Sequence, residues 1–463
     1  AFEQYDKTRR NTVEMIQYAA VVSLDWFENM DRHMQHSFQQ FAFGCMTRSK
    51  KVTYENLRLR DSSFTDKVLN EFLETSNLQL STSNSAAFTP FKLRELELPN
   101  RIVMAPMGQY SAVNGLVSDW HLVHYGSRAT GGIGLIITEM TAISETGRIT
   151  EGCAGIYNSE QLKQWKKITD FIHDNTSTKI GIQLGHSGRK GATKKPWEGN
   201  GPMEKPWNLI SASPIPFNEN FATPKEMTLE DMAEIKAQFV QAAKNANEAG
   251  FDMIELQAHH GFLLASFLSP LTNIRTDEFG GNIENRLKYP LEVFKAIREV
   301  FPTEKPISVR ISATDWTENG ISEQDVFIIT TAFKNAGADI INVSTGNTVA
   351  GQKPQTGRMW QTPFSDTVRN TTHIPTITAG YIQDIDQINT ILLNGRADLV
   401  ALGRPLLLDA NFVRNAQAYE QFQANDIPNP YKMSVSHLYP LKASERKQVE
   451  GMKKALKPKS NKL

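Results

Sequence analysis

The sequence lacks the residues that mark several common classes of protein. Its 463 residues include only two cysteines, Cys45 and Cys153, and no CxxC pair. We therefore expect no disulfide framework, no cysteine-held iron–sulfur cluster and no metal site. No apolar run reaches the roughly 18 residues that a membrane-spanning helix needs. Basic and acidic residues number 50 each, so neither nucleic acid nor an acidic membrane is an expected partner.

The first residues, AFEQYD, are polar and have none of the features of a secretory signal peptide. They also lack an initiator methionine, which fits a piece of a longer chain. We expect a cytoplasmic enzyme that acts on a small molecule, and the sequence leaves its oligomeric state open.

Residues 1–74 contain no proline and, apart from Gly44, no glycine. Their apolar residues recur at helical spacing, so we predict a helical segment whose main role is packing. One such stripe consists of Met15, Ala19, Val22, Trp26 and Met30. Residues 75–87 are rich in serine, threonine and asparagine and are interpreted as a linker. Residues 441–463 are basic, and we expect a frayed, solvated tail there.

From residue 88 to about residue 440, short apolar runs alternate with longer amphipathic stretches, a pattern typical of parallel βαβ units. The expected strands are 102–105, 135–138, 180–184, 253–256, 307–311, 340–343, 376–378 and 399–402. Helices are expected at 161–174, 229–249 and 323–336, among others. Eight such units over about 350 residues favour a (β/α)₈ TIM barrel. No GxGxxG follows a strand, which argues against a Rossmann domain.

The carboxyl ends of the strands are where a TIM barrel places its reacting groups. Small residues lie at the last three ends, where backbone N–H groups can approach a phosphate closely, although glycines also end strands for turn geometry alone. These positions are Ser344, Gly346, Gly380 and Gly403, with Arg404 directly after the last.

Three longer polar side chains also lie near strand ends. Arg310 needs a partner, because an unpaired buried guanidinium is costly; a polar cofactor ring and a structural salt bridge are the two alternatives. Gln183 can both donate and accept, as the amide edge of a flavin requires. His260 can donate to a carbonyl oxygen that gains charge during hydride transfer, or it can be structural.

These residues lie within a series of longer motifs. The motifs are residues 100–107 (NRIVMAPM), 120–126 (WHLVHYG), 188–190 (GRK), 269–281 (SPLTNIRTDEFGG), 285–286 (NR) and 394–398 (NGRAD). Their order resembles the Old Yellow Enzyme family of FMN oxidoreductases, particularly its bacterial ene-reductase and dienoyl-CoA-reductase-like branches. The resemblance extends from residue 88 to about residue 431.

The resemblance implies FMN at the barrel mouth, with NADH or NADPH as the hydride donor in a ping-pong cycle. It implies that Gln183 and Arg310 bond the polar edge of the flavin, with Arg310 stabilising negative charge on the reduced ring. Residues along the ring would be Ala105, Pro106, Met107, Gly108 and Met140. Residues around the phosphate would be Ser344, Gly346, Gly380, Gly403 and Arg404.

The sequence departs from the family at the acceptor side of the site. The family usually has a His and a His or Asn three residues apart to bind the acceptor carbonyl, and here the pair is Gln257 and His260. A tyrosine that often delivers the proton is replaced by Phe262, which has no proton to give. Gly108 stands where the bacterial branch often has a cysteine. Tyr110 is retained and can bond the substrate, so we name Tyr110, Gln257 and His260 as the catalytic candidates.

A second resemblance concerns residues 3–72. The pairs and runs that carry it are Arg9-Arg10, 41–43 (FAF) and 56–61 (NLRLRD). They are similar to the end of the FAD-dependent hydroxylase that is fused to such barrels in 2-aminobenzoyl-CoA monooxygenase/reductase and salicylyl-CoA hydroxylase-like proteins. This implies that the segment is the remnant of such a hydroxylase, and that an upstream FAD hydroxylase domain is a partner.

We therefore predict an FMN-dependent NAD(P)H oxidoreductase that reduces an activated C=C bond of a carbonyl or acyl-CoA compound. It would be the reductase half of an aromatic acyl-CoA monooxygenase/reductase if the second resemblance holds. Two alternatives stay open. One is an NADH oxidase of the same family, and the other is a non-catalytic flavin-binding or docking subunit that supports a hydroxylase.

Overall fold

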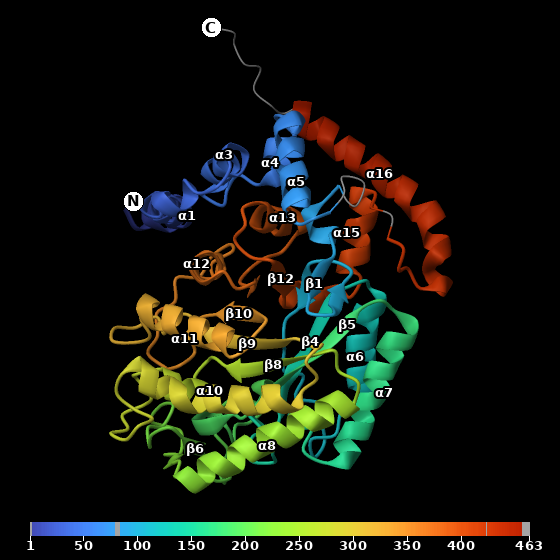
Figure 1. Ribbon diagram of the computed structural model, residues 1–463. Helices are drawn as coiled ribbons and strands as arrows, with labels where there is room; N and C mark the ends of the chain where they lie inside the picture. Colours follow the sequence, from blue (N-terminus) through green and yellow to red (C-terminus); the bar gives the residue numbers. More distant parts are fainter. Residues whose placement is uncertain (1, 79–83, 423, 456–463) are drawn as a thin grey trace.

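The structure is a computed structural model that describes residues 2–78, 84–422 and 424–455 (Figure 1). Its centre is a closed barrel of parallel strands in the order β10-β11-β12-β3-β4-β5-β8-β9. The strands are β3 (Ile102–Met104), β4 (Leu135–Ala142), β5 (Lys179–Gly185), β8 (Met253–Ala258), β9 (Ile307–Ser312), β10 (Ile340–Ser344), β11 (Thr376–Thr378) and β12 (Leu399–Leu402). All eight predicted strands are present, and the predicted TIM barrel is confirmed.

Each barrel strand is followed by a helix on the outside of the barrel. These helices are α6 (Asp119–Thr130), α7 (Ser159–Asn175), α8 (Leu229–Glu248), α10 (Ile283–Val300), α11 (Glu323–Asn335), α12 (Thr362–Thr372), α13 (Ile385–Leu393) and α15 (Phe412–Glu420). The shorter elements between them are α9 (Leu263–Leu268), α14 (Arg404–Leu408) and the paired strands β6 (Ile210–Ser211) and β7 (Lys225–Glu226). The helices begin where the sequence offers capping side chains. Thr228, for example, accepts from the backbone N–H of Asp231 at the start of α8.

The barrel interior is apolar at the amino ends of its strands. Twelve buried apolar residues form a separate cluster there. Three of them, Leu93, Leu96 and Leu98, come from the antiparallel hairpin of β1 (Phe91–Leu93) and β2 (Leu96–Leu98). The hairpin closes this end of the barrel, so a ligand can enter the barrel interior only at the carboxyl ends of the strands.

A bulge in β4 alters where its side chains point. Ile137 pairs with Gly181 and Met140 with Gln183, so β4 contains one residue more than β5 between these pairs. The extra residue turns Glu139 toward α6 and leaves Met140 in register with Gln183.

The N-terminal segment is helical, as predicted, and lies against the barrel helices. It consists of α1 (Phe2–Glu28), α2 (Met30–His33), α3 (Phe38–Thr47), α4 (Tyr54–Arg58) and α5 (Ser62–Thr75). Val22 and Trp26 of the predicted stripe are buried, and Trp26 stacks on His33 with 4.4 Å between the ring centroids. The main attachment is at α13, where Asp386 accepts from Thr53 Oγ1 at 2.5 Å and from Glu55 N at 2.8 Å. The segment is therefore part of the folded unit.

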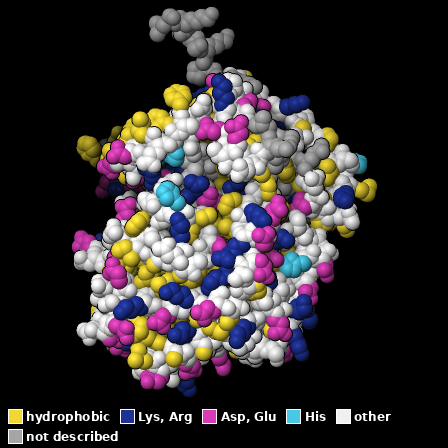
Figure 2. Space-filling model, in the orientation of Figure 1, with side chains coloured by type: hydrophobic (Ala, Val, Ile, Leu, Met, Phe, Trp, Pro, Cys, Tyr) yellow, Lys and Arg dark blue, Asp and Glu magenta, His cyan; other side chains and the backbone are white. Residues whose placement is uncertain are grey.

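The opposite face of α1 is apolar and exposed. Figure 2 shows hydrophobic side chains gathered at the upper left, over the N-terminal helices. The exposed residues on α1 include Phe2, Tyr5, Ile16, Leu24 and Phe27. None of the described helices is both long and apolar enough to span a membrane.

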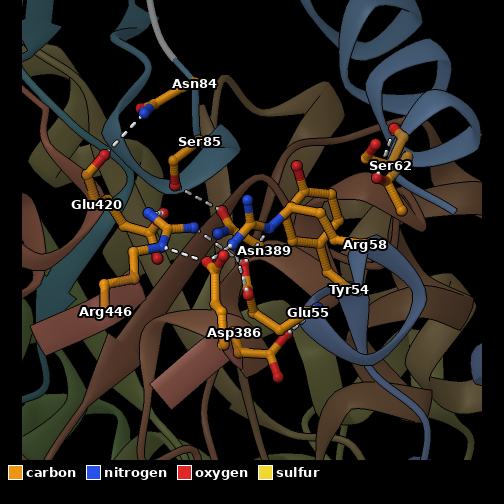
Figure 3. A network of polar contacts seen from close by, with 12 residues as sticks. Tyr54, Glu55, Arg58, Ser62, Asn84, Ser85, Asp386, Asn389, Glu420 and Arg446 are labelled. Carbon is orange, nitrogen blue, oxygen red and sulfur yellow. Dashed lines mark hydrogen bonds and ion pairs between the residues drawn. The ribbon is translucent and has the colours of Figure 1, made fainter. Parts of the chain in front are cut away.

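The prediction of a frayed tail from residue 441 is wrong for the residues up to Ala455. They belong to α16 (Lys432–Ala455), which packs on α15. Arg446 and Glu420, which Figure 3 labels, pair at 2.6 Å. Arg446 also pairs with Glu450 at 2.9 Å, and Arg58 of α4 pairs with the same Glu450 at 2.7 Å. These ion pairs, which join α16 to α15 and α4 within the same chain, cannot be inferred from the basic composition. The rest of the tail, residues 456–463, lies outside the described residues.

The expected linker ends inside the core. Ala86, Ala87 and Phe88 form a short 3-10 helix and are buried, and Ser85 Oγ donates to Asn389 Oδ1 at 2.9 Å (Figure 3). Residues 79–83 of the expected linker lie outside the described residues.

Candidate functional site

A cavity of about 710 Å³ opens at the carboxyl ends of the barrel strands. This volume is within the range of small-molecule and cofactor sites. Seven predicted site residues line it: Ala105, His260, Arg310, Ser344, Gly380, Gly403 and Arg404. The sequence analysis did not name Trp360, Gln361 and Tyr381, which also line it. They come from the connections after β10 and β11, where no strand pattern indicates which residues turn inward.

Arg310 of β9 is the buried cation of this cavity. The residue is only 9% exposed, and its Nε has no hydrogen-bond partner in the described part of the chain. Burial lowers the pKa of its guanidinium, and the nearby Glu255 opposes that shift. A buried, unpartnered guanidinium is costly unless a ligand completes its contacts. Arg310 therefore indicates a ligand with polar or negatively charged atoms.

Below Arg310 lies a buried carboxylate that the sequence analysis missed. Glu255 of β8 is fully buried and accepts from Gln183 Nε2 at 2.7 Å, Asn342 Nδ2 at 2.8 Å and Ser308 Oγ at 3.1 Å. Burial raises the pKa of Glu255, whereas Arg310 and these three donors act to lower it. The one signal in the sequence was a glutamate inside the apolar run 253–256.

Gln183 and Gln257 lie below the lining of the cavity rather than on it. Gln257 Nε2 donates to Gln183 Oε1 at 3.4 Å, a weak bond, and Gln257 Oε1 is buried without a partner among the described residues. Gln257 also lies close to Gly185 and Met140: a Cβ on Gly185 would come within 2.3 Å of Gln257 Oε1 and 2.9 Å of Met140 Cγ. The two glutamines, Met140 and Glu255 thus form one connected layer.

His260 has an unusual backbone conformation at the cavity edge. Its φ of 56° is in the left-handed region, and its backbone N–H donates to Ser312 Oγ at 2.9 Å. Its ring Nε2 lies 2.7 Å from Ser344 Oγ. Burial, then Arg310 and Lys190, hold the pKa of His260 well below its ordinary value. The ring is therefore neutral at pH 7 and can serve as a hydrogen-bond donor or acceptor, but not as a charged acid.

The connections after β11 and β12 form the open end of the cavity. Gly380 has a φ of 103°, and a Cβ there would come within 2.9 Å of the Trp360 ring. Next to Gly403, the guanidinium of Arg404 lies 4.4 Å from the centroid of Tyr381. Gly346 does not line the cavity; its surroundings are Gln352 and Trp316. The absence of side chains at Gly380 and Gly403 and the positive charge of Arg404 suit the binding of an anionic group at this end of the cavity.

The loop after β3 carries Pro106, Met107, Gly108 and Tyr110, none of which lines the cavity in this structure. A Cβ on Gly108 would meet the Tyr110 ring at 2.8 Å, so this ring covers Gly108. Burial raises the pKa of Tyr110 to about 12. Met107 does approach β12, because a Cβ on Gly403 would lie 3.4 Å from its sulfur.

A second buried carboxylate holds this loop. Glu139, turned outward by the β4 bulge, accepts from the backbone N–H of Gln109 at 2.9 Å and from Tyr125 OH at 3.3 Å. His121 Nε2 lies 3.3 Å from the same carboxylate. The residues of motif 120–126 thus support the site loop from behind.

The comparisons agree with this geometry. Residues 86–422 match the model of the NADH:flavin oxidoreductase / NADH oxidase family. The chain belongs to this family. It is 42% identical over 334 residues to an NADPH dehydrogenase of Listeria monocytogenes serotype 4a (strain HCC23), covering 72% of the chain and 94% of the relative. An NADPH dehydrogenase of Clostridium acetobutylicum is 40% identical over 349 residues, with 74% and 98% covered.

Solved structures share the fold. Morphinone reductase aligns with a TM-score of 0.61 and 28% identity, over 73% of this chain and 90% of that one. A 2-naphthoyl-CoA reductase in complex with 2-naphthoyl-CoA aligns with a TM-score of 0.65 over 71% of this chain, at 23% identity, which shows a common fold alone. This chain covers 52% of that reductase.

The resemblance to the Old Yellow Enzyme family is thereby confirmed, and the enzyme is an FMN-dependent oxidoreductase that uses NADH or NADPH. Its cavity fits FMN in three respects: its volume, the unpartnered Arg310 and the low bulk around Gly380 and Gly403. The family model leaves residues 1–85 outside, so the hydroxylase interpretation of the N-terminal segment stays a prediction.

Proposed function

We propose that this enzyme reduces a carbon–carbon double bond that is activated by a carbonyl group or an acyl-CoA thioester. The observation that carries the proposal is the pairing of a buried, unpartnered Arg310 with a neutral His260 in one cavity. Arg310 suits the polar edge of a redox cofactor, and His260 suits the oxygen of a polarised acceptor.

For the cofactor, the proposal assigns the polar edge of the flavin to Gln183 and Arg310. Ala105 to Gly108 and Met140 would lie along the ring, and the phosphate would lie near Ser344, Gly346, Gly380, Gly403 and Arg404. Bound FMN supplies a ring that takes up a hydride and releases it again. Gly346 is the least supported of these residues, because its neighbours in this structure are Gln352 and Trp316.

For the acceptor, His260 would donate a hydrogen bond to the carbonyl oxygen, with Gln257 and Tyr110 as further contacts. Because the imidazole of His260 is neutral, it would polarise the carbonyl through a hydrogen bond and would not act as a positively charged acid. Ser344 must release Nε2 or share it when an acceptor binds, since the two atoms are 2.7 Å apart. Phe262 cannot give the proton that completes the reduction, so solvent or another residue supplies it.

An anaerobic reoxidation screen tests this proposal. The FMN-loaded protein is reduced with NADH or NADPH, and its absorbance is followed as enones, dienoyl-CoAs and dearomatised benzoyl-CoA analogues are added. We expect at least one class to reoxidise the flavin faster than air does. Protein that contains FMN but is reoxidised by oxygen alone would favour the NADH oxidase alternative.

The second candidate is a docking subunit that supports an FAD hydroxylase. Gln257 and Phe262 favour it, because both replace residues that the family uses on the acceptor. Reduction of FMN by NAD(P)H with no response to any acceptor, and tight binding to an FAD hydroxylase, would support this candidate over the first.

A further inference from the structure

Glu255 has the most complete set of hydrogen bonds of the ionisable groups near the cavity, yet no step of the proposed reaction uses it. Its two oxygens accept three bonds, from Gln183, Ser308 and Asn342. These partners come from three different strands, β5, β9 and β10. The barrel thus directs one donor from each of three strands to one carboxylate.

Burial raises the pKa of Glu255, whereas Arg310 and the three hydrogen-bond donors act toward its ionised form. An ionised carboxylate can only accept hydrogen bonds, and each of its three partners can donate. The guanidinium of Arg310 is the cation close enough to act on it electrostatically. Arg310 forms no ion pair within 4.0 Å among the described residues, although its strand, β9, pairs directly with β8, where Gln257 lies opposite Arg310 and Glu255 opposite Ser308. The two charges therefore act between neighbouring strands without direct contact.

The carboxylate also determines which way Gln183 presents its amide. Because Nε2 donates to Glu255, Oε1 must point away from it, and Oε1 is the atom that Gln257 approaches at 3.4 Å. Gln183 therefore offers a hydrogen-bond acceptor on the side toward the mouth of the barrel.

We propose that Glu255 is a positioning residue that orients the amide of Gln183 and offsets the charge of Arg310, and that it thereby sets the reduction potential of the bound FMN. This inference rests on the proposed placement of FMN over Gln183 and Arg310. A flavin gains negative charge when it is reduced, and a positive charge beside it favours the reduced form. The Glu255 carboxylate weakens that preference.

Replacing Glu255 with Gln tests the charge while keeping the shape of the side chain. We expect E255Q to bind reduced FMN about tenfold more tightly relative to oxidised FMN, which for a two-electron couple raises the midpoint potential by about 30 mV. The potential is measured by anaerobic dye titration of the FMN-loaded protein. The matched control is Ser308→Ala, which removes one uncharged hydrogen-bond donor from Glu255 but keeps the carboxylate, and should leave the potential unchanged.

Glu255→Asp separates orientation from charge. The aspartate keeps the carboxylate, but its side chain is one methylene shorter, so the carboxylate lies farther from Gln183. We expect a potential close to that of the parent and about tenfold weaker FMN binding, because a hydrogen bond to a charged group is lost. A role limited to packing would reduce stability in E255Q and E255D alike and would not shift the potential upward in E255Q alone.

The outcomes separate this inference from the proposed function. Parent protein that binds no FMN would overturn the proposed function and this inference together. Parent protein with FMN, and E255Q with an unchanged or lower potential, would overturn only the role of Glu255. If E255Q does not fold, the double variant E255Q/R310Q, which removes both charges, should be recovered as folded protein; its failure to fold would contradict the pairing of Glu255 with Arg310.

Discussion

At the residue scale, burial shifts the pKa values of the ionisable groups in this site. Arg310 is charged without a direct counter-ion. His260 is neutral because burial disfavours its charged form and because protonation would place a second cation beside Arg310. Glu255 supplies the opposing charge from below. Each of these roles depends on neighbours from other strands rather than on the residue type.

The role assigned to His260 gives the first prediction. His260→Ala should slow acceptor-dependent reoxidation by about a hundredfold, since it removes a hydrogen-bond donor from the site of developing charge. Reduction of the flavin by NAD(P)H should change far less. Stopped-flow absorbance measures both half-reactions. An unchanged reoxidation rate would show that His260 does not contact the acceptor, and His437→Ala, at an exposed histidine, is the control.

At the element scale, residues at the carboxyl ends of the strands have two tasks: they form the turn that follows the strand, and they leave space for a ligand. Gly380, after β11, shows this combination, because its left-handed backbone and the Trp360 ring both exclude a Cβ. Glycine is thus required at this position for two reasons: the backbone has a positive φ, and a Cβ would contact the Trp360 ring that lines the cavity.

Gly380→Ala is therefore expected to lower the affinity for FMN by at least about tenfold, by straining the backbone and pushing Trp360 into the cavity. Fluorescence titration of the FMN-free protein with FMN measures it. The control is Gly281→Ala, since Gly281 also has a positive φ, of 82°, but has open space where its Cβ would be. A comparable loss of affinity in both variants would assign the effect to backbone strain alone.

The attachment of the N-terminal segment is also a property of elements. Asp386, on α13, accepts two hydrogen bonds from the Thr53–Glu55 turn of the segment. Asp386→Ala should cost about 1–3 kcal/mol by leaving these donors unpaired, and should increase hydrogen exchange in α4 and α5. FMN content should stay the same, because α13 presents Asp386 to the segment and not to the cavity. Asp31→Ala, at an exposed carboxylate of the same segment, should change neither measurement.

At the scale of the whole molecule, buried neutral histidines make stability depend on pH. Burial lowers the pKa of His124 and of His186 to about 3. Between pH 6.5 and 3 the unfolded chain therefore binds protons that the folded chain does not, so the free energy of unfolding falls as the pH falls.

Each of the two histidines should lower the free energy of unfolding by about 1.4 kcal/mol per pH unit once the pH is well below 6.5. Urea unfolding at pH 7.5, 6.0 and 5.0 measures the slope. His124→Leu should reduce the slope, and His437→Gln, at an exposed histidine, should not. A slope that is the same in all three proteins would contradict the assignment of His124.

The strands, the barrel helices and the helical character of residues 1–74 could all be predicted from the sequence, because short apolar runs and helical spacing are local properties of the chain. The extent of the tail helix could not, since α16 is held by the ion pairs of Arg446 with Glu420 of α15 and of Glu450 with Arg58 of α4. Seven of the predicted site residues line the cavity because the rule about strand ends is general. Glu255 and Glu139 were missed, because their inward or outward direction depends on barrel register and on the bulge in β4. Trp360 was missed because it lies in the connection after β10, where no strand pattern indicates which residues turn inward.

The sequence by itself determined the family, the barrel and the residue types available at each strand end, because these follow from motifs and periodicity along one chain. Only the tertiary structure decided which of those residues share an environment: the carboxylate of Glu255 below Arg310, the neutral ring of His260, and the second carboxylate behind the loop after β3. The physical reason is that ionisation, hydrogen-bond direction and the cost of an unpaired charge are set by neighbours in space, and closure of the barrel creates those neighbours.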